Sequence, residues 1–208
     1  GLEPGAVFEY FEALCAIPHG SHNTKAISDF LVDFAKKQQI RYIQDESTNI
    51  ILFADGTCGL EGHEPVVLQG HMDMVCEKDE GCPIDRDTQG LDLCHDNFCV
   101  FAKGTTLGGD DGIALAYAMA LIADRTIPHP PLEVIITVDE EVGMLGADVI
   151  DVSMLKGRKM INLDSEDEGI FTVACAGGAT ATISLNVNRK AVYGPCVRLC
   201  VDGLRGGH

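Results

Sequence analysis

The chain has 208 residues, and 32 acidic against 15 basic residues give it a formal net charge of −17 at pH 7. This balance disfavours nucleic acid and anionic membranes as partners, because both are bound through clustered Lys and Arg. The chain contains no apolar run of 18 residues, and its first residues are neither basic nor apolar, so we expect neither a membrane span nor a signal peptide. We therefore expect a cytoplasmic protein, and its 46% hydrophobic content is enough for a substantial core.

The nine cysteines support the same compartment. Their number is odd and no two are spaced as Cys-x-x-Cys, so we expect free thiols in a reducing environment rather than a disulfide framework. The pairs Cys94/Cys99 and Cys196/Cys200 each lack a second pair at zinc-finger spacing. A structural zinc knuckle is therefore not predicted.

The first quarter of the chain predicts two amphipathic helices followed by a hairpin. The helices are expected over residues 5–17 and 24–38, where apolar residues recur at helical spacing. The hairpin strands are expected over residues 41–46 and 49–54, where β-formers flank a short polar turn.

The loop between the two helices contains several polar residues. Ser21 or Asn23 is expected to cap the second helix. His19 and His22 could bind a metal, but no partner lies at a suitable spacing. We interpret both as loop or capping residues.

The middle of the chain alternates strands with helices, which predicts an α/β fold with a mixed, mostly parallel sheet flanked by helices on both faces. The helix at 113–123 is apolar nearly all round and is expected to be buried. The other expected elements are strands at 65–68, 98–103, 132–138, 159–163 and 170–176, a loop over 77–98, and one or two helical turns within 144–151.

The residue pattern changes after Gly177-Gly178. Polar and apolar residues alternate over 179–187, as in a half-exposed antiparallel strand. We therefore predict two domains. Residues 1–177 would form the first domain, and residues 178–208 would begin a second domain. About 30 residues cannot close a core unaided, so we expect the second domain to be incomplete.

A His and several acidic residues follow successive apolar segments. Functional groups of open α/β sheets gather outside the carboxyl ends of the strands. Each of these residues alone could merely cap a helix or face solvent, but their repetition at the ends of four segments favours a shared site. They are His71, Asp73, Asp110, Glu140, Glu141 and Asp164.

Converging carboxylates repel one another unless a cation neutralises them. One His with several carboxylates suits Zn²⁺, Mn²⁺ or Co²⁺. The acidic groups are too many for one tetrahedral zinc, so a pair of metal ions with a bridging carboxylate and water fits better. The residues predict a metal-dependent hydrolase in which either Glu140 or Glu141 holds metal while the other faces the water as a base. Asp73 could bond the ring N–H of His71.

The motifs around these residues resemble a known family. Segments 70–73, 109–112, 139–143 and 162–165 look like the successive metal motifs of two-zinc metallopeptidases related to carboxypeptidase G and peptidase T. Over essentially the whole chain, the amino-acid sequence resembles the bacterial aminoacyl-histidine dipeptidases, also called Xaa-His dipeptidases or peptidase D. The stretches that carry this likeness are 17–22, 71–78 and 105–110.

The resemblance implies a zinc-exopeptidase-like catalytic domain, the start of an α+β lid domain, and a homodimer for the full-length protein. It also implies a dipeptide substrate with a C-terminal His and a cis peptide at Asp110–Asp111. The implied roles are His71 and Asp164 on one zinc, Asp110 bridging, Glu141 on the second zinc, Glu140 as general base, Asp73 as the partner of His71, and His208 on the substrate carbonyl.

Two departures from the family pattern stand out. Asp111 follows the bridging Asp, where many close relatives have Asn, and this adds negative charge. No residue matches the family's last zinc ligand, a His from a C-terminal segment, so we expect the chain to be the N-terminal part of a longer enzyme. Two alternatives stay open, namely an N-acyl amino acid hydrolase of the same family and an inactive metal-binding fragment.

Overall fold

The structure is a computed structural model that describes residues 2–96, 98–165, 169–174, 177, 182–188, 191, 193–195, 197–198 and 200. Contacts divide the chain into two units, Gly1–Ile170 and Phe171–His208, and each is described by itself. The predicted domains, with their boundary at 177, stay a prediction. All regular elements of the described residues belong to the first unit.

The helices and strands lie close to the segments expected from the sequence. The helix that follows the first loop, for example, buries Ile27, Leu31 and Phe34, which recur at the spacing of one helix face. In chain order the elements are α1 (Gly5–Cys15), α2 (Lys25–Gln38), β1 (Arg41–Gln44), β2 (Ile50–Ala54), β3 (Val66–His71), β4 (Leu93–His95), β5 (Val100–Ala102), α3 (Gly109–Ala123), β6 (Leu132–Thr137), α4 (Leu145–Val149) and β7 (Lys159–Asn162).

Five strands form the main sheet in the order β1-β2-β6-β3-β7. The strands β6, β3 and β7 are parallel, whereas β2 is antiparallel to both of its neighbours. Four of the five strands therefore point the same way, which confirms the predicted mixed, mostly parallel sheet. All six residues of β6 are buried, as expected for a central parallel strand, whereas all four residues of β7 are exposed.

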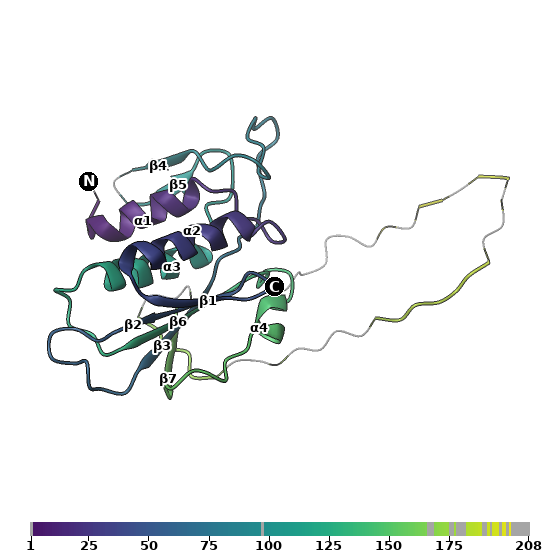
Figure 1. Ribbon diagram of the computed structural model, residues 1–208. Helices are drawn as coiled ribbons and strands as arrows, with labels where there is room; N and C mark the ends of the chain where they lie inside the picture. Colours follow the sequence, from purple (N-terminus) through teal and green to yellow (C-terminus); the bar gives the residue numbers. More distant parts are fainter. Residues whose placement is uncertain are drawn as a thin grey trace. The chain divides into compact units, whose positions relative to one another are not determined.

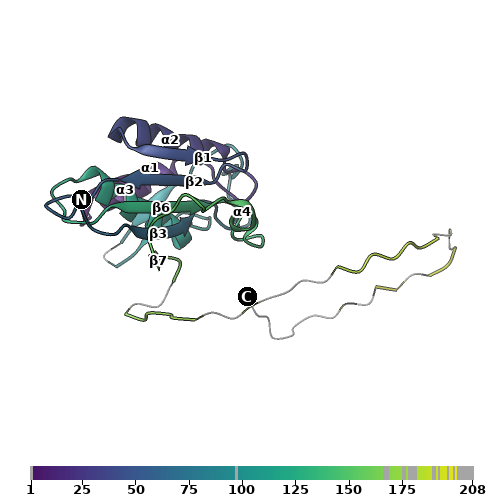
Figure 2. The same ribbon diagram turned by 60° about the horizontal axis from the view of Figure 1, so that its bottom comes forward.

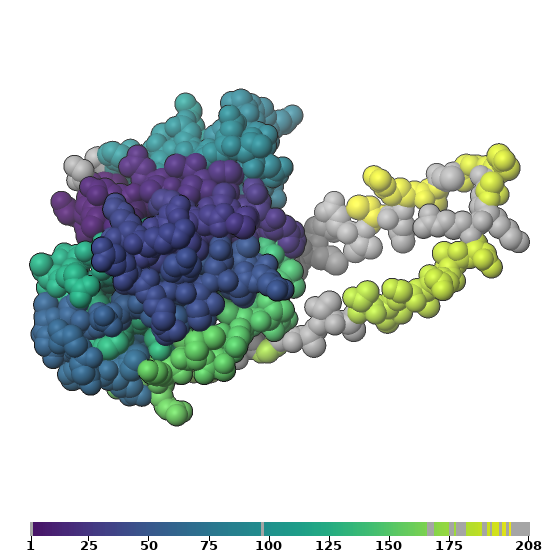
Figure 3. Space-filling view, viewed as in Figure 1, coloured from purple at the N-terminus to yellow at the C-terminus, as the bar shows by residue number. Residues whose placement is uncertain are grey.

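One face of the sheet forms the hydrophobic core with α1, α2 and α3. Figures 1 and 2 show these three helices together on one side of the strands, and Figure 3 shows α1 and α2 side by side on the surface. Leu52 and Leu68 point into this core. On the opposite face, Glu133 accepts hydrogen bonds from the backbone N–H groups of Lys156 and Gly157. The expectation of helices on both faces is therefore wrong for α1, α2 and α3, which all pack on the first face. The loop residues Lys156 and Gly157 cover part of the second face.

Three expectations about strands also differ from the structure. β4 lies inside 77–98, which was predicted to be a loop, and it pairs antiparallel with β5. The sequence did not indicate this strand because three residues are too few to reveal an alternation of apolar and polar residues. The strands expected at 170–176 and 179–187 are absent from their described residues, 170–174 and 182–187, and a strand needs a partner to persist.

Within the described part of the chain, no helix combines the length and apolar character needed to cross a bilayer.

Candidate metal centre

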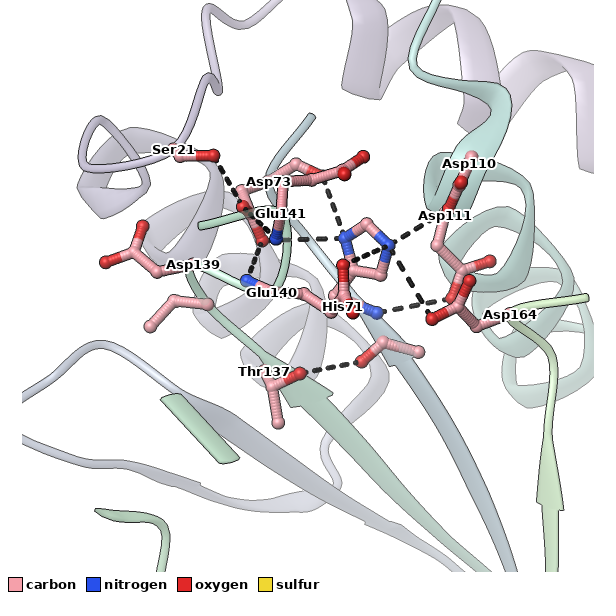
Figure 4. Close-up of polar contacts among 12 residues, drawn as sticks. Ser21, His71, Asp73, Asp110, Asp111, Thr137, Asp139, Glu140, Glu141 and Asp164 are labelled. Carbon is pink, nitrogen blue, oxygen red and sulfur yellow. Dashed lines mark hydrogen bonds and ion pairs between the residues drawn. The ribbon is translucent and has the colours of Figure 1, made fainter. Parts of the chain in front are cut away.

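The predicted residues meet because three parallel strands end at one edge of the sheet. His71, the last residue of β3, pairs in register with Thr137, the last of β6. Glu140 follows β6 by three residues, and Asp164 follows the end of β7 by two. Figure 4 shows the imidazole of His71 in the middle of these side chains.

His71 is only 1% exposed, and its two ring nitrogens face different groups. Nδ1 lies 2.9 Å from the backbone carbonyl oxygen of Asp73 and 3.5 Å from its carboxylate. Since both are acceptors, Nδ1 carries a hydrogen. Nε2 faces a third acceptor, the Asp110 carboxylate, so a metal ion that binds Nε2 would replace a proton there. The ring N–H therefore contacts Asp73 as expected, but its closer partner is the backbone oxygen.

Carboxylates surround Nε2 on the other side of the ring. Their oxygens lie 3.0 Å away in Asp110, 3.9 Å in Glu140 and 4.0 Å in Asp164. Two groups of potential ligands have all their ligand atoms within 4.8 Å of one another, His71 with Asp110 and Glu141, and His71 with Glu140 and Asp164. Both groups share His71, and the second contains Glu140, for which the resemblance implies the role of base.

Asp73 ties the loops of the site together, and its side chain is buried. One oxygen accepts the hydroxyl of Ser21 at 2.8 Å and the backbone N–H of Glu141 at 3.4 Å. The other accepts the backbone N–H of Glu140 at 3.0 Å. Burial alone would raise the pKa of Asp73, but these donors and His71 outweigh it and lower the pKa.

Asp111 is a second buried carboxylate beside His71. It accepts the backbone N–H of His71 at 3.2 Å. Gly70 makes this approach possible, because a Cβ there would lie 2.4 Å from the Asp111 carboxylate. Burial raises the pKa of Asp111 to about 7, with the charges of Asp164 and Asp110 adding to the effect against the pull of His71. The peptide bond Asp110–Asp111 is cis, as the resemblance implied.

The donor set fits a divalent cation. Burial raises the pKa values of Glu140 and Glu141, and neighbouring carboxylates add to the rise. Burial would lower the pKa of His71, but Asp73 and the nearby charge of Asp111 reverse this and raise it to about 10. The protonated imidazole of His71 is thus a single positive charge among several carboxylates. A divalent metal ion bound at Nε2 in place of the proton would bring more positive charge to them.

A cavity of about 560 Å³ adjoins the carboxylates. Its lining includes the carboxylates of Asp110, Asp111 and Asp164 and the apolar side chains of Phe8 and Phe11 from α1. Such a combination of apolar surface with a few convergent polar groups is typical of small-molecule sites.

The structure brings six of the seven predicted site residues together; His208 lies outside the described residues. The roles assigned to them stay proposals. The sequence interpretation missed Ser21 and Asp139. Ser21 was expected to cap α2, whose N-cap is Thr24, and instead donates to Asp73. Asp139 bonds His22, and its place directly before Glu140 was the one signal in the sequence.

No family model matches the chain. The chain is 38% identical to the cytosol non-specific dipeptidase of Escherichia coli, over 209 aligned positions that span 100% of this chain and 43% of that protein. Its fold matches the crystal structure of the aminoacylhistidine dipeptidase from Vibrio alginolyticus with a TM-score of 0.78 and 39% identity, covering 81% of this chain and 34% of that one.

A more distant match supports the fold alone. The aminopeptidase PepT from Bacillus cereus superimposes with a TM-score of 0.65 and 23% identity, over 78% of this chain and 43% of that one. The chain spans less than half the length of each of these relatives. The family resemblance of the motifs is confirmed: along its whole length this chain is a relative of the cytosol non-specific dipeptidase, and it corresponds to less than half of that protein.

Proposed function

We propose that the complete protein is a metal-dependent dipeptidase. One observation carries the proposal: Nε2 of His71 faces three carboxylates from three separate segments, with Asp73 behind the ring. The identity of the whole chain to a dipeptidase supports the reaction class.

The cofactor we propose is a pair of Zn²⁺ ions, with Mn²⁺ or Co²⁺ as substitutes. His71 and Asp164 would hold one ion, Glu141 the other, and Asp110 would bridge them. When bound, such ions polarise the substrate carbonyl and make a water molecule acidic enough to attack it near neutral pH.

Glu140 is the residue we assign as general base. Its raised pKa and its position 3.9 Å from His71 Nε2 suit a group that takes the proton of the attacking water and gives it to the leaving amine. Asp73 keeps the proton of His71 on Nδ1 and holds the backbone of Glu140 in place. The cavity beside Asp110 and Asp164 offers space for an apolar part of the substrate.

The substrate we propose is an unblocked dipeptide, preferably with a C-terminal His, and His208 would help to bind its carbonyl. The solved relative from Vibrio alginolyticus is named for aminoacyl-histidine, whereas the Escherichia coli relative is named non-specific. We further propose a homodimer in the cytoplasm, with neither nucleic acid nor membrane as partner.

The decisive experiment compares two neighbouring glutamates in the complete protein. Glu140→Gln should lower kcat for β-alanyl-histidine by about 10² to 10⁴-fold and keep the bound metal, since it removes the base. Glu141→Gln should reduce the metal content instead. Unchanged turnover in Glu140→Gln would refute the mechanism, and metal analysis of both variants separates the two roles.

A substrate panel tests the reaction itself. Free dipeptides, the same dipeptides with an N-acetyl group, and dipeptides without His should be compared at equal concentration. Faster hydrolysis of the N-acetylated compounds would favour the N-acyl amino acid hydrolase. A 208-residue chain that binds metal without turnover, beside an active complete protein, would identify the chain alone as an inactive fragment.

A further inference from the structure

The loop between α1 and α2 lies directly against the loop that follows β3. The backbone N–H of Met74 donates to the carbonyl of His19 at 3.2 Å, and Gly20 forms a parallel β-bridge with Met74. A Cβ at Gly20 would lie 2.6 Å from the sulfur of Cys76. Gly20 therefore permits a close approach that brings the next two residues to the candidate metal centre.

Ser21 completes the set of donors around Asp73. Its hydroxyl donates at 2.8 Å to the same oxygen that accepts the longer, 3.4 Å bond from the backbone N–H of Glu141. The second oxygen of Asp73 accepts the backbone N–H of Glu140. The orientation of the Asp73 carboxylate, and with it the position of both glutamate backbones, thus depends on Ser21.

His22 makes a second contact with the segment that carries the glutamates. Its backbone N–H donates to Asp139 at 2.6 Å, and its Nδ1 lies 3.2 Å from the other oxygen of that carboxylate. Both residues have left-handed backbones, with φ of 66° at His22 and 54° at Asp139. Such conformations are unfavourable for residues with a Cβ, so the paired contact stabilises a turn that the chain alone would not adopt.

We infer that Ser21 and His22 are positioning residues of the candidate metal centre. Through Asp73 and Asp139 they fix the backbone of Glu140 and Glu141 from a loop more than 100 residues away in sequence. The inference deepens the proposed function and rests on it for its kinetic part. Neither residue touches the reacting atoms, and their effect is exerted on where the base and the metal ligand stand.

The test uses Ser21→Ala, with Ser21→Thr as the conservative variant and Ser28→Ala as the matched control. Ser28 of α2 also donates a hydroxyl bond, of 2.7 Å, to the carbonyl of Thr48, which lies in the turn between β1 and β2. With metal removed by a chelator, hydrogen–deuterium exchange of the peptide containing Glu140 and Glu141 is measured by mass spectrometry. We expect about tenfold faster exchange in Ser21→Ala, and wild-type exchange in Ser21→Thr and Ser28→Ala.

Kinetics of the complete protein supply the second measurement. Ser21→Ala should lower kcat by about tenfold with KM little changed, Ser21→Thr should restore it, and Asp139→Ala should behave like Ser21→Ala. Equal exchange in Ser21→Ala and wild type would overturn the inference, even if the enzyme is active. Lack of dipeptidase activity in the wild type would refute the proposed function, and the exchange measurement would still decide whether these residues position the glutamates.

Discussion

Two buried carboxylates flank His71, and they have opposite ionisation behaviour. Asp73 is 1% exposed and Asp111 is 2% exposed, and both contact His71. The pKa of Asp73 is lowered, whereas the pKa of Asp111 is raised to about 7. The comparison shows that burial alone does not determine the charge of a carboxylate.

The difference lies in the donors that each carboxylate receives. Asp73 accepts bonds from Ser21, Glu140 and Glu141. Among the described residues, the Asp111 carboxylate accepts one hydrogen bond, from the backbone N–H of His71. It also faces other acidic groups. Donors stabilise the ionised form, so Asp73 stays charged, while Asp111, with its pKa raised to about 7, is only partly ionised near neutral pH.

The largest effect is expected from Asp73→Ala. Removing this carboxylate leaves the Ser21 hydroxyl and the backbone N–H groups of Glu140 and Glu141 without their acceptor. It also removes the negative charge beside Nδ1 of the buried His71. We expect a loss of about 3–5 kcal/mol in the free energy of unfolding, measured by urea denaturation at pH 7.

An exposed carboxylate serves as the control for Asp73→Ala. Asp96 also accepts two backbone N–H bonds and also has a lowered pKa, but it lies at the surface. Its substitution by Ala should cost much less free energy of unfolding than Asp73→Ala, because water can replace the carboxylate at an exposed position. Equal losses in the two variants would show that burial of Asp73 contributes nothing.

A gain in stability is expected from Asp111→Asn. The folded pKa of about 7 lies above the ordinary Asp pKa of 3.8, so the folded state binds the proton more tightly than the unfolded state. Asp111 therefore destabilises the wild type increasingly as the pH rises from 4 to 7, and the penalty persists at higher pH. In the presence of a chelator, Asp111→Asn should be about 2–4 kcal/mol more stable at pH 8 and similar to wild type at pH 4. A constant difference across this range would contradict the assignment.

A smaller loss is expected from Gly70→Ala. The new Cβ would lie 2.4 Å from the Asp111 carboxylate and 3.0 Å from the Cβ of Ala114. Overpacking of this kind costs about 1–3 kcal/mol. At pH 4, where the charge of Asp111 costs little, adding Asp111→Ala should recover part of the loss because the nearer obstacle is gone. If the double variant were no more stable than Gly70→Ala in urea denaturation, the contact with Asp111 would not be the cause.

Much of the sheet and of the metal centre was predictable from the sequence. Apolar runs mark β3, β6 and β7, and parallel strands bring their carboxyl ends to one edge, so the meeting of His71, Glu140 and Asp164 followed from local patterns. The free thiols expected from cysteine spacing are also confirmed for the seven cysteines described as free.

The remaining features depend on contacts between distant segments. Ser21 stands where a helix cap was expected, and nothing near it in sequence indicates that it donates to Asp73. The burial of Asp111 depends on the missing side chain of Gly70, which lies in another element. The sequence predicted β7 as a strand but not its exposure, which depends on what packs against it.

The connections of Asp73 also bear on the order of events during folding. Its side-chain bonds join residues 52 and 67 positions apart in sequence, and the contact of His22 with Asp139 spans 117 positions. Closing such long loops costs chain entropy before any contact can repay it. We therefore expect the metal centre to assemble late, after β3 and β6 have paired, so that a newly made chain acquires its metal ligands in their final arrangement only once the sheet exists.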